Sequence, residues 1–363
     1  MIIKRAFYRE ATLTSLAVGL VLGALFAILG LTKLLGQAAG GEHSSDVVFK
    51  LLGLELLGSL DILFPLALFV GVLLTVGRWY RDNEMTVLAA SGIGLGSISR
   101  PLIQLALCFS ILVAVLALYV SPWASTESEQ IKNKAENETE ISAIAPGVFI
   151  ELRRSGRILY VEKIRRKAIL ENVFVSDSLS PTQNVLVASR GRQVTDSSTG
   201  EEFLVLENGS LYEGTAGEPD YRIVNFTSYT TRLEPKDATT QAPPLDGLPT
   251  SMLLGSGNRR HIAEWHWRLA KPISVLVLAI FAFVLAHTDA RRGRVANFFA
   301  AILVYFIYTN LIGIGETLLK DGRVPLALGL WWVHAAVGIV GVYLLARRVQ
   351  NKPLFSLPKL VRQ

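Results

Sequence analysis

The sequence predicts an α-helical membrane protein with six transmembrane helices and one inserted all-β domain that resembles a jellyroll. Hydrophobic residues make up 51% of the 363 residues, charged residues only 18%, and the mean hydropathy is +0.40. A soluble domain carries about 25% charge. The charges here are also unevenly spread, because several runs of span length hold almost none. Short alternating runs follow residue 148, between the third and fourth of these stretches.

Each predicted span is a stretch without charge, long enough to cross a bilayer. The first run is too long for a signal peptide and is interpreted as a retained span. Trp79, Tyr80, Trp265 and Trp267 would anchor the second and fourth spans, which are the shortest, at the membrane surface. The six predicted spans are residues 11–32, 62–77 with an apolar extension at 51–60, 101–124, 272–288, 295–315 and 324–346.

Lys and Arg predict the orientation of these spans. With the N-terminus inside, the short inner segments hold 14 basic residues and the short outer segments hold six. The positive-inside rule therefore places both termini in the cytoplasm and the insert, residues 125–266, outside. The insert has a net charge of −4 and the remainder +10, so the basic character lies at the membrane flanks. It does not indicate a nucleic-acid partner.

The insert reads as a β domain with two flanking linkers. Residues 127–144 are polar and helix-prone, as if they continue the third span, and residues 236–257 are rich in Pro, Gly and Thr. Asn208-Gly209 is typical of a tight hairpin turn. The pattern predicts a sandwich or open jelly roll within a three-part chain, 1–124, 125–266 and 267–363. Seven short strands are expected, at residues 148–153, 157–164, 172–176, 184–189, 202–207, 210–213 and 221–227.

The sequence excludes several kinds of chemistry. Cys108 is the single cysteine, the five histidines are scattered, and there is no Gly-Lys dipeptide, HExxH or GxSxG. We therefore expect no enzyme activity, no ATP hydrolysis by this chain, no metal and no cofactor. Ionisable residues inside the spans are almost lacking, which argues against an ion-coupled transporter. Asp61 is the nearest candidate and is interpreted as an interfacial residue at the outer end of the second span.

The loop between the second and third spans predicts a short helix near residues 82–92. Asp82 or Asn83 could cap it, with Glu84 near its positive end. Met85, Leu88 and Ala89 would then form an apolar face. Such a face fits a partner protein, or a helix lying on the inner leaflet, and composition alone slightly favours the leaflet.

Two other places carry candidate lipid contacts. Lys33, at the outer end of the first span, could pair with a lipid phosphate, although the residues alone favour ordinary snorkelling. The fifth span is aromatic, and its rings could line an acyl-chain cavity or simply pack between helices. These rings are Phe298, Phe299, Tyr305, Phe306 and Tyr308.

Taken together, these motifs resemble the lipopolysaccharide-export permease family LptF/LptG, also called YjgP/YjgQ. The likeness runs nearly end to end, and the Met1-Ile2-Ile3 start looks more like the LptF branch than the LptG branch. It is carried by Met1 to Arg5 with Glu10, Leu34-Leu35-Gly36, Phe64-Pro65-Leu66-Ala67-Leu68, Asn83-Glu84-Met85-Thr86-Val87-Leu88 with Ser91-Gly92, and Glu264-Trp265-His266-Trp267-Arg268-Leu269.

The resemblance implies a permease subunit of an ABC-type exporter in the bacterial inner membrane. Its partners would be an LptG-like second permease subunit, an LptB-like ATPase dimer, an LptC-like periplasmic jellyroll protein and lipopolysaccharide. Glu84, Met85 and Leu88 would couple to the ATPase. The first and fifth spans would line a lipid cavity, with Lys33, Phe298, Tyr305 and Phe306 in contact with lipid. Gly30 departs from the pattern, because some members have a second basic residue there.

Two other function classes remain open on the residues alone. A membrane-anchored sensor or assembly factor would use the β domain to bind an extracytoplasmic partner and would need no ATPase. An intramembrane enzyme would need buried ionisable residues, which the spans almost lack. Copurification with an ATPase discriminates the exporter from the sensor.

Overall fold

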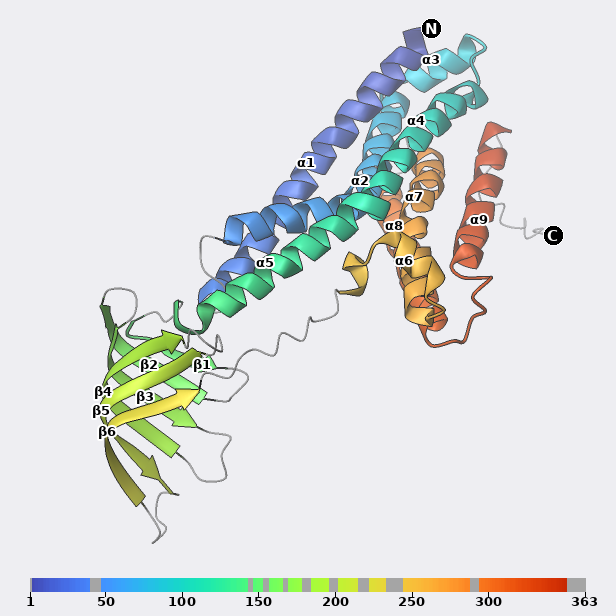
Figure 1. The fold of residues 1–363 in the computed structure, drawn as a ribbon. Helices are drawn as coiled ribbons and strands as arrows, with labels where there is room; N and C mark the ends of the chain where they lie inside the picture. Colours follow the sequence, from blue (N-terminus) through green and yellow to red (C-terminus); the bar gives the residue numbers. More distant parts are fainter. Residues whose placement is uncertain are drawn as a thin grey trace, which may run out of the picture. The chain divides into compact units, whose positions relative to one another are not determined.

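The computed structural model describes residues 2–39, 47–142, 146–152, 157–165, 169–177, 184–195, 202–214, 222–232, 244–287 and 294–350 (Figure 1). The chain divides into two compact units. The first comprises Met1–Gly30, Gly53–Ser128 and Pro243–Gln363, and the second comprises Leu31–Leu52 and Glu129–Ala242. The first unit is helical, and the second contains the β sheet.

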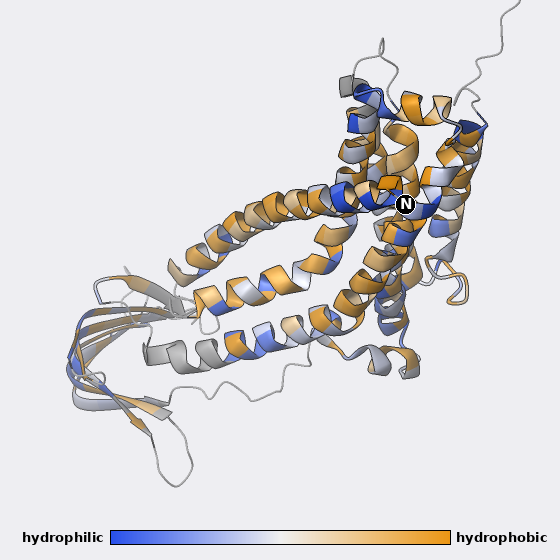
Figure 2. Ribbon diagram, turned by 90° about the horizontal axis from the view of Figure 1, so that it is seen from above, coloured by the Kyte–Doolittle hydropathy of each residue, from blue (hydrophilic) through white to orange (hydrophobic). Residues whose placement is uncertain are grey.

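Six helices in the described part of the chain are long and apolar enough to cross a membrane, which confirms the predicted class. Figure 2 shows apolar residues along these helices. They are α1 (Ile2–Ala39), α2 (Val48–Arg81), α4 (Leu95–Val115) with its continuation, α7 (Arg259–Leu285), α8 (Arg294–Lys320) and α9 (Trp331–Val349). The continuation of α4 is a π-helical segment, η1 (Leu116–Val120), and then α5 (Ser121–Ser142), so the polar linker after the third span is helical as expected.

Most of the helices run past the charge-free stretches, although α7 ends at Leu285, before the predicted end at 288, and α9 begins at Trp331, after the predicted start at 324. The largest difference is at the fourth span, which was expected to begin at Pro272. α7 instead begins at Arg259, because Asn258 caps its start by accepting a hydrogen bond from the Arg260 N–H at 2.9 Å. Arg268 and Lys271 therefore lie within the helix and not in an outer loop.

The spans differ sharply in burial. In α7, 67% of the most apolar window is buried within the chain, and in α2 61%, against 6% in α1 and 22% in α8. α7 packs against α4, α8 and α9, and its side chains make up much of the main hydrophobic core. The protein therefore folds around α2 and α7, while α1, α8 and also α9, of whose most apolar window 17% is buried, keep apolar faces exposed.

α1 meets α2 through small residues. Ala11 and Ser15 are buried on α1, and the Gly19 backbone approaches Ala67. A side chain at Gly71 would overlap Ser15, so only glycine allows this approach. The contact is narrow, and it leaves most of α1 uncovered.

Six antiparallel strands form one sheet in simple chain order among the described residues. They are β1 (Phe149–Leu152), β2 (Arg157–Arg165), β3 (Ile169–Asp177), β4 (Asn184–Thr195), β5 (Glu202–Glu213) and β6 (Arg222–Arg232). This confirms an all-β insert. The described strands give a meander in one sheet, with the buried cluster on one face.

A crease crosses five of these strands. In β2, Val161 and Ile164 face the core and the two residues between them face outward; β3 repeats this with Leu170 and Val173. At this crease, one residue of each strand lies opposite the corresponding residue of the next strand, but the two are not paired in the ladder. The residues on either side of this row are paired. Because each strand changes phase there, inward residues from both halves of the sheet join one cluster. The row is Glu162, Asn172, Ser189, Asn208 and Thr227.

The crease corrects the hairpin predicted at Asn208-Gly209. Both residues lie inside β5, so the two short strands expected there are one. Asn208 has φ 53°, and a side chain on Gly209 would overlap the Val187 carbonyl and the Phe226 ring. Positive φ and a missing Cβ suit a crease as well as a turn, which is why the local signal misled.

Candidate functional site

A short helix, α3 (Glu84–Ala90), follows α2 after a two-residue turn, as the sequence predicts. Asn83 makes this turn with φ 60°, and its carbonyl accepts the N–H groups of Thr86 and Val87, both at 3.1 Å. The Asn83 side chain makes no capping bond, contrary to expectation. Gly92, with φ 79°, ends the element after Ser91.

The two faces of α3 have different surroundings. Met85 is 5% exposed in the same buried cluster as Trp79 and Ile98, and Leu88 packs against this cluster. Val87 is 63% exposed, and the Glu84 side chain is 47% exposed. Of the expected apolar face, Met85 and Leu88 are therefore covered by the chain itself, whereas Ala89 is exposed. The exposed residues of α3 are Glu84, Thr86, Val87, Ala89 and Ala90.

Ion pairs fix the start of α3 to two spans. The Arg78 guanidinium lies 2.5 Å from a Glu10 carboxylate oxygen and 3.9 Å from Glu84. The Trp79 indole N–H donates to the same Glu10 oxygen at 2.7 Å. Among the described ion pairs, Glu84 thus holds only the longer contact to Arg78, and its half-exposed carboxylate can accept another cation.

Asp82 is held by its neighbour. A hydrogen bond from the Arg81 side chain lowers the pKa of the Asp82 carboxyl, and the charges of Arg81 and Arg78 add to this. The group therefore keeps its negative charge well below neutral pH.

The aromatic candidates on α8 point in two directions. Phe298 and Phe306 are exposed, whereas Tyr305 is partly buried and stacks on Phe69 of α2 with ring centroids 6.1 Å apart. Phe299 is also exposed, and Tyr308 is buried. Lys33 is exposed on the α1 segment that belongs to the second unit. Of the candidate lipid contacts, only Phe298, Tyr305 and Phe306 therefore lie together, on α8.

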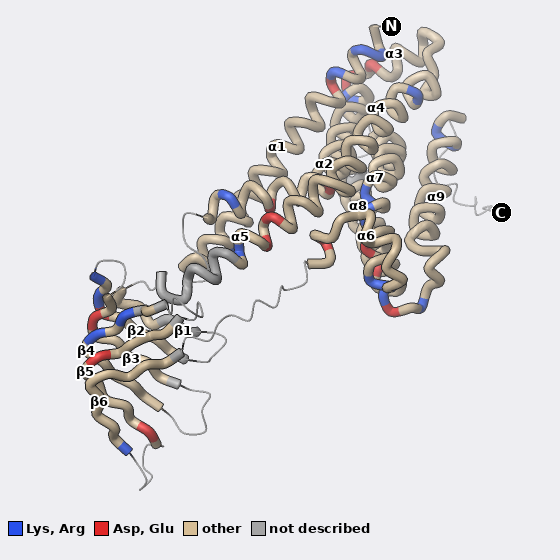
Figure 3. The backbone as a smooth tube through the Cα atoms, viewed as in Figure 1, with Lys and Arg blue, Asp and Glu red and all other residues tan. Residues whose placement is uncertain are grey.

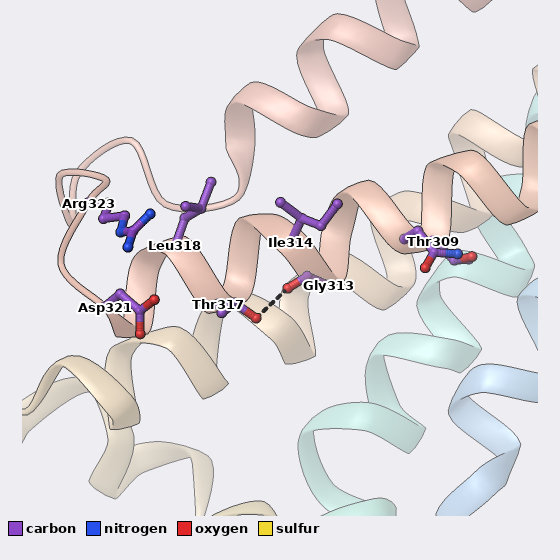
Figure 4. Close-up of a pocket in the computed structure, with 8 residues that line it drawn as sticks. Thr309, Gly313, Ile314, Thr317, Leu318, Asp321 and Arg323 are labelled. Atoms are coloured by element: carbon purple, nitrogen blue, oxygen red, sulfur yellow. Dashed lines mark hydrogen bonds between the residues drawn. The ribbon is translucent and has the colours of Figure 1, made fainter.

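An amphipathic pocket of about 600 Å³ lies along the second half of α8 and the turn that follows Lys320 (Figure 4). Asn310 donates to the Phe306 carbonyl at 2.8 Å and Thr317 to the Gly313 carbonyl at 3.0 Å, which keeps both side chains on the helix surface. The pocket is lined by Thr309, Asn310, Gly313, Ile314, Thr317, Leu318, Asp321 and Arg323. Apolar and polar groups thus alternate on one exposed face.

Arg268 is a buried centre that the charge-based prediction had assigned to an outer loop. Its side chain bonds Glu264 at 2.9 Å and Thr250 at 2.9 Å, and also three backbone carbonyls. Those carbonyls belong to Leu245, Asp246 and Leu248, in the segment of η2 (Leu245–Gly247) that leads to α6 (Thr250–Gly255). A fully hydrogen-bonded guanidinium therefore ties the end of the insert to α7.

Asp61 corrects a second interpretation. It is fully buried within the chain and not exposed to solvent, and its carboxylate lies 2.6 Å from the Lys271 ammonium. The sequence pattern does not predict this pair, because it places Lys271 in the loop before the fourth span. The spacing of charges gives no signal that residues 210 positions apart meet. Among the described residues, no group of His, Cys, Asp or Glu could hold a metal ion.

These features define a multi-span membrane protein with a short helix at one end of its bundle, an exposed amphipathic face on α8 and an extramembranous β sheet. They contain no constellation typical of a catalytic centre within the described ranges.

The model of the lipopolysaccharide export system permease LptF/LptG family matches residues 5–347, and the chain belongs to this family. It is 28% identical over 342 residues to the lipopolysaccharide export system permease protein LptF of Escherichia coli K12, covering 92% of each chain. The LptF protein of Shigella flexneri shows the same identity and coverage. The predicted resemblance, including its LptF lean, is confirmed.

Proposed function

We propose that this chain is one of two permease subunits of an ATP-driven exporter that extracts lipopolysaccharide from the inner membrane and delivers it to a periplasmic bridge. The unequal burial of the spans carries this proposal. α2 and α7 are packed within the chain, whereas α1, α8 and α9 leave apolar faces open. A second permease subunit opposite these faces would enclose a path for an amphipathic lipid.

The α8 face suits such a lipid. Phe298 and Phe306 offer apolar area for acyl chains, and the pocket beyond them adds hydroxyl and amide groups. Arg323, at the end of that pocket, can pair with a phosphate. Lys33 is a further candidate for lipid phosphates.

The energy would come from a separate LptB-like ATPase dimer, since this chain has no P-loop. α3 is the proposed docking element. Glu84 is half exposed and shares Arg78 with Glu10, so it can exchange that contact for a basic group of the ATPase. Met85 and Leu88 would anchor α3 to its own chain, so that a push on α3 moves α2.

The basic residues at one end of the helical unit support an orientation in the membrane. Lys and Arg gather near α3 and the first turns of α1, while long stretches of the spans carry no charge (Figure 3). The positive-inside rule supports a cytoplasmic location for this end and for both termini. The β domain would then be periplasmic and would pass lipid to an LptC-like partner. Its crease opens one apolar side formed by both halves of the sheet.

Photocrosslinking in the assembled complex tests the lipid path. A photoreactive residue at Phe306 should capture lipopolysaccharide in an ATP-dependent manner, and one at buried Tyr308 should not. Lys33 and Phe298 provide further sites. Absence of adducts at all exposed sites, in a complex that still transports, would remove α8 and α1 from the path.

Charge reversal tests the docking element. Glu84→Arg should abolish copurification with the ATPase or uncouple its hydrolysis from transport. Asp82→Arg is the matched control, since it reverses an exposed carboxylate two residues earlier and outside α3. If both variants transport normally, the coupling role of Glu84 is wrong.

A further inference from the structure

The Asp61–Lys271 pair joins the two most buried spans. Asp61 of α2 is 0% exposed, the Lys271 side chain of α7 is 15% exposed, and the N–O distance is 2.6 Å. Asp61 lies 20 residues before Arg81, the end of α2, which is about 30 Å of helix at 1.5 Å per residue. The pair is therefore remote from α3 and cannot act by touching an ATPase.

Stability alone does not explain this pair. An ion pair removed from water gains little over apolar residues of similar size, because desolvation opposes the attraction. Moreover, the second Asp61 carboxylate oxygen, Oδ1, is buried and has no hydrogen-bond partner among the described residues. An unsatisfied buried acceptor is costly, and in a membrane span it is by default a sign of function.

Both partners lie at proline interruptions of their helices. Pro65 cannot donate to the Asp61 carbonyl four residues earlier, and Pro272 directly follows Lys271. Helices bend most readily at such points. The third span is interrupted as well, by the π-helical segment η1, whose Leu118 carbonyl accepts a hydrogen bond from Thr250 at 2.7 Å.

The pair also connects two mechanical routes. α2 leads into α3 within three residues, so displacement of α3 acts on α2. α7 carries Arg268, which grips the segment from Leu245 to Thr250 at the end of the insert. Within the helical unit, this ion pair is a direct polar contact between α2 and α7.

We propose that Asp61 and Lys271 are positioning residues of the transport cycle, whose ion pair makes the outer parts of α2 and α7 move together when α3 is displaced. This inference rests on the function proposed above. The unpartnered Asp61 oxygen gives Lys271 a second acceptor, so the pair can persist while the helices change their angle at Pro65 and Pro272.

The test uses the complex with its partner permease and ATPase in lipid vesicles. Asp61→Asn and Lys271→Met should each lower the lipopolysaccharide released per ATP about fivefold, with ATP hydrolysis changed less than about twofold. The charge-swapped double variant, Asp61→Lys with Lys271→Asp, should restore the ratio to within about twofold of the unmodified complex. An unchanged ratio in the single variants, or no restoration in assembled double variants, overturns the proposal.

Glu316→Gln is the matched control. It breaks an ion pair of the same 2.6 Å length, with Lys320, inside a single helix. A merely structural ion pair would lower the amount of assembled complex in all variants and leave the release per ATP unchanged. An equal loss of release per ATP in Glu316→Gln would also contradict a specific link between α2 and α7.

Spin labels give a readout that does not depend on lipid. In a Cys108→Ser background, labels at exposed Val87 of α3 and exposed Leu254 of α6 should show an ATP-driven distance change that Asp61→Asn abolishes. A change that persists in Asp61→Asn, or no change in the unmodified complex, overturns the link. If the unmodified complex moves but releases no lipopolysaccharide, the proposed function fails and the link stands.

Discussion

Two polar sites in the helical unit differ in exposure. Near α3, Glu10, Arg78 and Glu84 meet in ion pairs whose side chains are 35–47% exposed. In the first half of α7, Arg268 is 1% exposed, and its side chain makes five hydrogen bonds. Water can replace any partner of the first set. Losing a partner of the second set leaves a buried polar group without a hydrogen bond, which is costly where water does not reach. The comparison separates an exposed surface, at Glu10, Arg78 and Glu84, whose side chains can change partners, from the buried Arg268 site, here called the closed joint, whose hydrogen bonds must persist.

The largest effect is expected at the closed joint. Arg268→Met should lower the free energy of unfolding by about 3–5 kcal/mol, because Glu264 would remain as a buried charge without its partner. Thermal and SDS unfolding in lipid–detergent micelles measure this. Adding Glu264→Gln to Arg268→Met should recover part of the loss. A decrease below about 1 kcal/mol would mean that the joint is not closed.

A smaller effect is expected where α3 is anchored. Met85→Ala should cost about 2–3 kcal/mol of local stability, because it leaves a cavity in the core. Val87→Ala, on the exposed face of the same helix, should change stability by less than about 0.5 kcal/mol. Hydrogen exchange of the α3 amides checks both. Equal effects would show that α3 has no buried face.

A still smaller effect is expected for the exposed ion pairs. Glu10→Gln should cost about 1 kcal/mol or less, and the cost should shrink at high salt. Comparing unfolding at low and high ionic strength tests this. A cost that is independent of salt would place Glu10 and Arg78 in a desolvated site and remove the contrast with Arg268.

The smallest effect concerns pH. The Asp82 pKa is lowered in the folded protein, so the stability that this group contributes is present above its unfolded pKa and is lost as pH falls through the folded value. Carboxyl-carbon NMR of Asp82 should show titration below the usual range, and Arg81→Gln should move it upward. No upward movement in Arg81→Gln would exclude the side-chain hydrogen bond as the cause.

Much of the fold was predictable because a bilayer imposes a length rule on uncharged segments. The same rule failed where charge is tolerated inside the protein. Lys271 and Arg268 interrupt the apolar run, yet they lie in α7, because Asp61 and Glu264 pair with them. Such pairing depends on which helices become neighbours, and no local pattern records it.

The candidate site was predictable in position but not in detail. The turn residues and the short apolar period of 84–90 predict α3, whereas the face that Met85 buries depends on Trp79 and on α4. Asn208-Gly209 shows the same limit in the sheet, since the two residues have the local properties of a turn and only the strand pairing makes them a crease.

The creased row fixes the number of residues that each of the five strands can have on either side of it. Five strands change phase at the same row, so deleting one residue inside any of them would turn the inward residues of one half of that strand outward. Length changes in relatives should therefore fall in the connections between strands, or occur in step on both sides of a strand pair. An alignment of relatives can be read for that rule without any further structure.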